Sequence, residues 1–306
     1  MFLKIRWILR SISIHSVNLD KDATLSPGML IPLNEKENSY QVDIKMQNKM
    51  KKKPQPKALT VIRSEAITPN MQRLTLQGEA LGQFPLDCEG SYIKLLFNEK
   101  GGTEIQGFSE NNRPVMRTYT IRRIDLQACT IEVDFVRHIT EDLQCGFAAR
   151  WAMSAKEGDT INIAGPGSIS NLNHEADWFF MAADMTALPA LSAKIRNLPE
   201  DAKGYAVISV ITEADIQPLD APAGMEIHWI TEQSLVDKIR ELEWQEGEAA
   251  VWCACEFDSM RALRQYFRNE KEVNRENIYI SSYWKQGVAE DGHKAIKQKD
   301  AELNEQ

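Results

Sequence analysis

The hydrophobic pattern of the chain changes near residue 170. Between residues 58 and 168, apolar and polar residues alternate in six short segments bounded by turn residues, a pattern typical of strands. From residue 177 onward, apolar strand-like segments alternate with helical ones, which indicates a parallel sheet with helical crossovers. We therefore expect an antiparallel β-barrel over 58–170, followed by an α/β domain with a parallel sheet over 171–306.

The expected elements follow from these periods. The barrel strands are expected at 58–63, 71–76, 91–97, 117–122, 130–136 and 160–164, with one helix at 146–155. The strands of the second domain are expected at 177–182, 205–212, 226–230, 249–254 and 278–283, with helices at 187–197, 234–242, 258–269 and 290–303. Asp258 or Ser259 is expected to cap the helix that starts there. Ligands of such a sheet bind at the carboxyl ends of its strands.

Charge excludes some functions and sets the N-terminal residues apart. The net charge of −8 argues against a nucleic-acid partner, and no run of eighteen apolar residues is present to cross a membrane. Residues 1–57 carry eleven Lys and Arg against five Asp and Glu, a net of +6. We expect them to be a disordered tail or upstream sequence read from an early start codon, a membrane-surface helix at 2–15 being the alternative.

The cysteines indicate reducing surroundings. Their number, five, is odd, and their spacing is irregular, so we expect no disulfide framework and place the protein in the cytoplasm. Cys253 and Cys255 lie two residues apart, as metal ligands do, but a zinc or iron–sulfur site needs four ligands. We expect both thiols to lie in the core, on one face of a strand, and expect no metal site.

Two segments of the first half suit a phosphate-bearing aromatic ligand. Arg117 offers a planar guanidinium for phosphate oxygens, Tyr119 shares its strand face and offers a ring for stacking, and Thr120 offers a hydroxyl and a backbone N–H. An ordinary strand with solvated arginines is the alternative. Gly146–Ala149 then opens a helix whose free N–H groups suit a diphosphate.

These motifs resemble those of the siderophore-interacting proteins, which are flavin-dependent ferric-siderophore reductases. The resemblance runs from about Ala58 to Lys297. It is carried by Arg-x-Tyr-Thr at 117–120, Asp-Phe-x-x-His at 134–138, Ala-x-x-Trp-Ala at 148–152, Asp-Met-Thr-Ala-Leu-Pro-Ala at 184–190 and Tyr-Trp-Lys-x-Gly at 283–287. It implies a ferredoxin-reductase-like fold, with an FAD-binding barrel and an NAD(P)H-binding α/β domain. Hydride would pass from NAD(P)H to FAD, and single electrons would then pass to the ferric siderophore, which releases Fe(II) for iron acquisition.

The resemblance also implies the site. Its cofactor contacts fall on Arg117, Thr118, Tyr119, Thr120, Asp134, Val136, His138, Gly146, Ala148, Ala149 and Trp151 for FAD, and on Asp184, Thr186 and Glu256 for the nicotinamide. A siderophore is an anionic chelate, and a chain this acidic would repel it without a basic patch. Lys94, Arg137 and Lys285 are the candidates for that patch, with three solvated charges as the alternative. Trp284 is expected to lie near the flavin edge or to anchor the last strand. No side chain is expected to act as nucleophile or general acid, and a monomer is expected.

The chain departs from the family pattern at three positions, and three other functions compete with the one that the resemblance implies. The family usually has glycine where this chain has Cys255, glutamate where it has Met185, and often arginine where it has Gly167. An iron–sulfur ferric reductase is disfavoured because residues 256–306 contain no cysteine. A general flavin or ferredoxin-type reductase, and a non-catalytic siderophore-binding protein, stay open. The sequence does not decide between NADH and NADPH.

Overall fold

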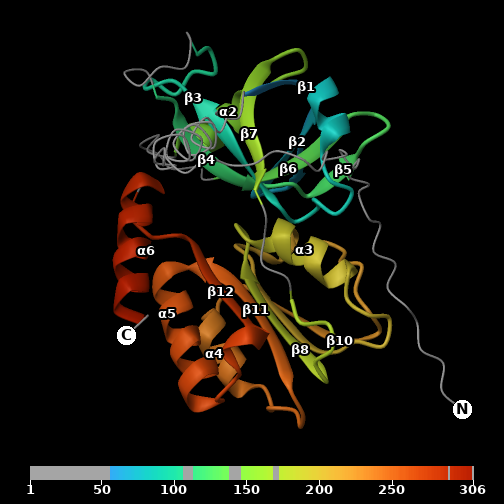
Figure 1. The fold of residues 1–306 in the computed structure, drawn as a ribbon, viewed down its shortest axis with the longest axis vertical. Coiled ribbons are helices and arrows are strands. Elements are labelled where there is room, and N and C mark those ends of the chain that lie inside the picture. Colours follow the sequence, from blue (N-terminus) through green and yellow to red (C-terminus); the bar gives the residue numbers. More distant parts are fainter. Residues whose placement is uncertain (1–55, 106–112, 138–145, 168–171, 289, 305–306) are drawn as a thin grey trace, which may run out of the picture. The chain divides into compact units, whose positions relative to one another are not determined.

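The first half of the chain is an antiparallel sheet of seven strands (Figure 1). The structure is a computed structural model and describes residues 56–105, 113–137, 146–167, 172–288 and 290–304. The strand order is β4-β3-β7-β1-β2-β6-β5. The bounds are β1 Lys57–Thr68, β2 Met71–Gln77, β3 Tyr92–Phe97, β4 Val115–Thr120, β5 Arg123–Asp125, β6 Thr130–Val136 and β7 Thr160–Gly167.

The sheet curls around one core, as the alternating pattern predicts. Inward residues such as Val61, Leu74 and Ile93 are fully buried in it. The curl brings β4 to β6, where the ring centroids of Tyr119 and Phe135 lie 4.3 Å apart. Helix α2, Phe147–Ser154, buries its alanine face against this core. The sequence analysis missed β5, because three residues are too short to show a period.

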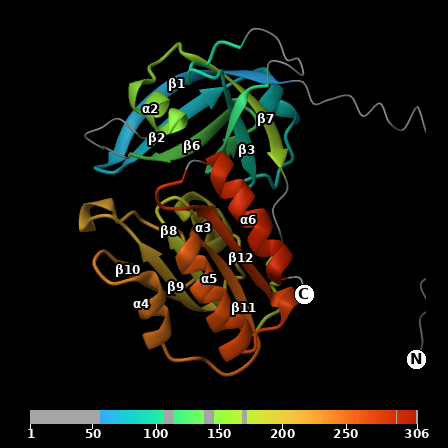
Figure 2. The same cartoon turned by 90° about the vertical axis from the view of Figure 1, so that its left-hand side faces the viewer.

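The second half is a parallel sheet of five strands in the order β10-β9-β8-β11-β12 (Figure 2). The strands are β8 Trp178–Asp184, β9 Lys203–Ser209, β10 Gly224–Ile230, β11 Ala249–Glu256 and β12 Ile278–Trp284. The helices are α3 Leu188–Arg196, α4 Leu235–Glu241, α5 Phe257–Gln265 and α6 Glu290–Asn304. Each strand and helix expected here is confirmed to within a few residues. No helix of the described residues is long and apolar enough to cross a membrane.

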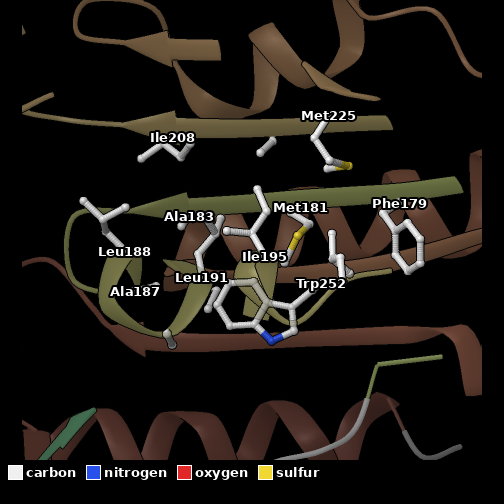
Figure 3. Close-up of a cluster of buried hydrophobic side chains, with 14 of the residues drawn as sticks. Phe179, Met181, Ala183, Ala187, Leu188, Leu191, Ile195, Ile208, Met225 and Trp252 are labelled. Carbon is white, nitrogen blue, oxygen red and sulfur yellow. The ribbon is translucent and has the colours of Figure 1, made fainter. Parts of the chain in front are cut away.

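Separate cores cover the two faces of the parallel sheet. On one face, Met181, Ile208 and Met225 meet Leu191 and Ile195 of α3 (Figure 3). The core on the other face is filled from the strands, α4 and α5, and α6 adds Ile296 at its edge. Because this sheet is buried on both faces, its central strands are continuous apolar runs.

Cys253 and Cys255 lie in the core that faces α5, with their sulfur atoms 4.0 Å apart. The expected core placement of this pair is therefore confirmed. No cluster of three or more metal-ligating side chains occurs in the part of the chain that the structure describes.

The cap expected for α5 was wrong. The helix begins at Phe257, and the side chain of Glu256 caps it by accepting hydrogen bonds from the backbone N–H groups of Asp258 and Ser259. Glutamate is long enough to fold back from the strand end, so the helix starts one residue earlier than the capping preferences predict. The helix also ends earlier as an α-helix, because Tyr266–Glu270 forms a π-helical turn.

The barrel strands and the α/β domain belong to one unit, Pro54–Gln306, and share contacts. Met71 of β2 is fully buried in the core on the α3 side of the parallel sheet, and Ile67 and Val136 pack against it. Asp215 follows β9 and accepts hydrogen bonds from the Thr68 hydroxyl at 2.7 Å and from the Asn70 side chain at 2.8 Å. An ion pair between Glu89 and Arg196 adds a second polar link.

The expected N-terminal extension, 1–57, lies almost wholly outside the described residues. Its last residue, Lys57, begins β1. Its Nζ donates to the Gly165 carbonyl at 3.0 Å.

Candidate cofactor and substrate site

Arg117 of β4 and the start of α2 lie together. The Arg117 guanidinium lies 5.7 Å from the centre of the Phe147 ring, and the Arg150 guanidinium lies 5.3 Å from the same ring. Two cations are thus gathered at the first turn of a helix by one aromatic side chain. Both side chains have further interactions in the structure.

The first turn of α2 is open where a phosphate would approach. Among the described residues, nothing lies within 4 Å of a Cβ built on Gly146, and the first N–H groups of a helix have no acceptor within it. The side chains of Ala148 and Ala149 are buried, so these residues have only backbone groups to offer a ligand.

Tyr119 is the candidate for the aromatic part of the same site. Its half-buried ring packs on Phe135 and on the barrel core. Two guanidinium groups and the first N–H groups of a helix suit a diphosphate, and a supported flat ring suits stacking against a flavin. The residues present therefore fit FAD.

Lys94 lies on the strand next to the Arg117–Thr120 motif. In the β3–β4 register Lys94 is opposite Thr118, and its Nζ donates to the Thr118 hydroxyl at 2.5 Å. Desolvation lowers the pKa of Lys297 on α6, and the charges of Lys94 and Arg264 lower it further. Lys94 therefore bonds to the motif strand, and its charge also acts on Lys297.

The remaining barrel candidates have structural partners. The Asp134 carboxylate pairs with Arg73 through two hydrogen bonds of 2.6 and 2.8 Å and lies 3.6 Å from Arg122. Trp151 packs edge-on against Phe135 in the barrel core. Only the backbone of Asp134 is left to meet a cofactor, and His138 lies outside the described residues.

The carboxyl edge of the parallel sheet holds the nicotinamide candidates. The strand order reverses between β8 and β11, and such a switch point is where these sheets bind ligands. Asp184 ends β8 and Glu256 ends β11 at this point. The sheet therefore brings together these two residues, which lie far apart in the sequence.

Asp184 is fully engaged by protein groups. One carboxylate oxygen accepts from the Thr186 hydroxyl at 2.5 Å and backbone N–H at 2.9 Å, and the other accepts from Trp284 Nε1 at 2.7 Å. Desolvation raises the pKa of Asp184, although these hydrogen bonds oppose the shift. Trp284 thus anchors the last strand to the first strand of the domain, as one of the two interpretations expected.

Glu256 is engaged in the same way. Besides capping α5, its second carboxylate oxygen accepts from the Gln286 backbone N–H at 3.3 Å. The Cys255 side chain points into the core and the Met185 sulfur accepts from the Ile211 N–H at 3.4 Å. Both departures from the family pattern are therefore buried side chains with protein contacts.

The three candidates for siderophore binding have different partners. Lys285 donates to Asp258 at 2.9 Å and lies over the Phe257 ring. Arg137 donates from Nη1 to the Pro69 carbonyl at 3.2 Å, at the turn between β1 and β2. Lys94 alone of the three is bonded to the motif strand.

Two family descriptions cover most of the chain. The siderophore-interacting FAD-binding domain matches residues 60–169, and the siderophore-interacting protein family matches residues 176–287. The chain belongs to the siderophore-interacting protein family. The FAD-binding assignment of the barrel and the resemblance drawn from the motifs are thus confirmed.

Relatives and solved structures agree with this family membership. The ferric vibriobactin reductase ViuB of Vibrio cholerae is 33% identical over 254 residues, covering 78% of this chain and 92% of the relative. An NADPH-dependent ferric-chelate reductase of Escherichia coli is 26% identical, covering 74% and 91%. The crystal structure of SipS from Aeromonas hydrophila superposes with a TM-score of 0.73 at 29% identity, covering 81% and 99%. A ferredoxin–NADP+ reductase from Plasmodium falciparum shares the fold, with a TM-score of 0.55 at 13% identity, covering 74% and 96%.

Sequence reasoning missed several residues of this siderophore-interacting protein. Phe147 gathers Arg117 and Arg150, and the aromatic residue at the helix start is the sequence signal that was available. Asp215 joins the two domains, but no local pattern marks it. Tyr92, whose ring lies 5.1 Å from Lys94 Nζ, was not distinguished from the other strand residues.

Proposed function

We propose that the protein is an FAD-dependent ferric-siderophore reductase. One NAD(P)H would reduce two ferric chelates, giving NAD(P)+, one proton and two ferrous ions. The observation that carries the proposal is the bond between Lys94 and Thr118, because it fixes a cation for an anionic chelate directly on the strand of the flavin motif. The names of the ferric vibriobactin reductase and ferric-chelate reductase relatives support the same activity.

Different residues of the barrel bind different parts of FAD. Arg117, Arg150 and the N–H groups at the start of α2 hold the diphosphate, and Tyr119 supports the flat ring. Thr118, Thr120 and the backbone of Asp134 and Val136 line the rest. Bound FAD supplies the exchange between a two-electron donor and one-electron iron acceptors.

The nicotinamide enters at the switch point of the parallel sheet. Asp184 and Glu256 act as positioning residues there, because their carboxylates hold the first turns of α3 and α5 at the edge of the site. Thr186, bonded to Asp184, lies at the same edge. We propose NADPH as the donor, on the name of the Escherichia coli relative.

Lys94, together with Lys285 and Arg137, attracts the chelate. A positive surface favours the reduced complex, which carries one more negative charge than the ferric complex. We further propose a cytoplasmic monomer, since its nicotinamide donor is supplied there, with the FAD-binding barrel at 58–170 and the NAD(P)H-binding domain at 171–306.

Anaerobic absorbance spectroscopy of the full chain tests the proposal. We expect flavin bands that bleach with NADPH and return when a ferric siderophore is added, with Fe(II) trapped by a ferrous chelator at two per NADPH. Bands that bleach but return only with free flavin or ferredoxin would overturn it in favour of a general reductase. Tight binding of a ferric siderophore without nucleotide consumption would overturn it in favour of a binding protein.

A further inference from the structure

The barrel presents an aromatic side chain where its last strand ends. Tyr92 of β3 is opposite Gly167 of β7, and a Cβ built on Gly167 would lie 2.0 Å from Tyr92 Cζ and 2.4 Å from its hydroxyl. The tyrosine ring therefore lies directly across the bare backbone of Gly167. A larger residue at position 167 would displace the ring, so the space holds either Tyr92 or a side chain from position 167.

Tyr92 shares its sheet face with Lys94 and with Thr118 and Thr120 of the flavin motif. Residues directly opposite each other in antiparallel strands share a face, and Tyr92 is opposite Thr120 while Lys94 is opposite Thr118. The Lys94 ammonium lies 5.1 Å from the centre of the Tyr92 ring. The residue as a whole is still 36% exposed. An exposed aromatic surface, an ammonium group and a hydroxyl thus lie side by side, next to the strand that binds FAD.

This combination has a definite chemical preference. A catecholate or phenolate iron chelate presents flat rings whose oxygens carry the negative charge. Such a ring stacks on an aromatic side chain while its oxygens face the ammonium group. Hydroxamate and carboxylate chelates have no ring to stack and gain only from the charge.

We propose that Tyr92 is a specificity-determining residue that selects ferric chelates with aryl-oxygen ligands, that is catecholates or phenolates. This inference rests on the proposed function and names its substrate class. Tyr92 supplies the stacking surface and Lys94 the charge. Gly167 contributes to this selectivity, because the Tyr92 ring occupies the space that a side chain at position 167 would fill.

Binding titrations of the FAD-loaded full chain test the inference. The probes are a ferric tris-catecholate, a ferric trihydroxamate and ferric citrate, each followed by the quenching of flavin fluorescence. In Tyr92→Leu we expect the Kd of the catecholate to rise about tenfold, because stacking on one ring is lost, and the other two Kd values to stay within about twofold. Tyr92→Phe keeps the ring and should retain most of the preference. Leu86→Ala changes an exposed side chain on the same domain and serves as the control.

The double variant Tyr92→Ala with Gly167→Arg sharpens the test. It replaces the ring by a guanidinium in the same space, so we expect the preference for the catecholate over citrate to fall at least tenfold. Circular dichroism and the flavin-to-protein absorbance ratio check the folding of every variant. Equal changes for all three chelates in Tyr92→Leu, or an unchanged catecholate Kd, would overturn the inference. A wild-type protein that binds FAD but reduces none of the three would instead overturn the proposed function.

Discussion

The charged side chains near the barrel motif and those at the carboxyl edge of the parallel sheet have different surroundings. At the barrel, Arg117 and Arg150 are held over one aromatic ring at an open helix start. At the sheet edge, the carboxylates of Asp184 and Glu256 accept hydrogen bonds from helix starts and from the segment around Trp284. We propose that the two cations bind a ligand, whereas the carboxylates bind groups of the protein itself.

The difference teaches how each half builds its site. In a barrel of paired strands, most backbone groups are bonded to a neighbouring strand. The groups that we propose to bind the ligand are therefore side chains on strand faces and the N–H groups of one short helix. A parallel sheet must turn a helix after every strand, and a strand-end carboxylate is well suited to cap that helix. Acidic residues at strand ends therefore hold the helix starts at this edge. We expect their removal to lower the free energy of unfolding more than it weakens ligand binding.

Asp184→Ala should give the largest effect on stability. It removes the acceptor of the Thr186 and Ala187 N–H groups and of Trp284 Nε1, which leaves buried donors unpaired at a cost of about 3–4 kcal/mol. Urea unfolding at pH 7 measures the loss, and Asp201→Ala, at an exposed turn, is the control. A loss below about 1 kcal/mol would contradict the structural role assigned to Asp184.

Arg117→Ala should show the opposite behaviour, a loss of ligand with little loss of stability. A guanidinium bonded to a phosphate is worth about 1.5–3 kcal/mol, so FAD affinity should fall about tenfold to a hundredfold. Titration of the apoprotein with FAD measures it, and Arg63→Ala, at the exposed Arg63–Glu65 pair, is the control. If the apoprotein of Arg117→Ala unfolds at much lower urea, the contrast between the two regions fails.

Asp215→Asn tests the link between the two regions. The carboxylate accepts from Thr68, Asn70 and Thr212, and an amide must turn a donor toward one of them, which should cost about 2 kcal/mol at pH 7. Burial alone would raise the pKa of Asp215, but these hydrogen bonds outweigh it and hold the pKa below its usual value. The wild-type carboxylate therefore stabilises the fold above the unfolded pKa of about 3.9, and this contribution is lost as the pH falls through the lower folded pKa.

Unfolding free energies at several pH values check this prediction. The difference between wild type and Asp215→Asn should stay constant above about pH 5 and shrink below about pH 4. A difference that grows toward acid pH would show that the carboxylate is not the stabilised form.

The fold was predictable because the hydrophobic patterns that mark its strands and helices are local in the sequence. Alternation marked the barrel strands and continuous apolar runs marked the parallel ones, so their order in the chain gave the architecture. The three-residue β5 was missed, and the cap of α5 was misplaced because Glu256 reaches over its own backbone.

The site was less predictable than the fold. The motif 117–120 predicted the cofactor strand, but the partners of each side chain depend on the register between strands. Tyr92 meets Gly167, and Asp215 meets Asn70, only after residues about 75 and 145 positions apart are brought together. The sequence also offered Lys94, Arg137 and Lys285 as equals, because it does not show which of them is bonded to the motif strand.

The smallest predicted effect distinguishes two of these lysines. Lys285 pairs with Asp258 at 2.9 Å, whereas Lys94 donates to the Thr118 hydroxyl on the motif strand. In steady-state reduction of a ferric siderophore, Lys94→Ala should raise KM about fivefold to tenfold, and Lys285→Ala should change it by no more than about twofold. The wild-type KM should rise with salt because long-range attraction is screened, and this salt dependence should weaken in Lys94→Ala but not in Lys285→Ala. Equal effects of the two substitutions would mean that the chelate contacts both the barrel and the parallel-sheet domain. The proposed contrast, in which charged groups of the barrel bind the ligand and those of the sheet edge bind the protein, would then be wrong.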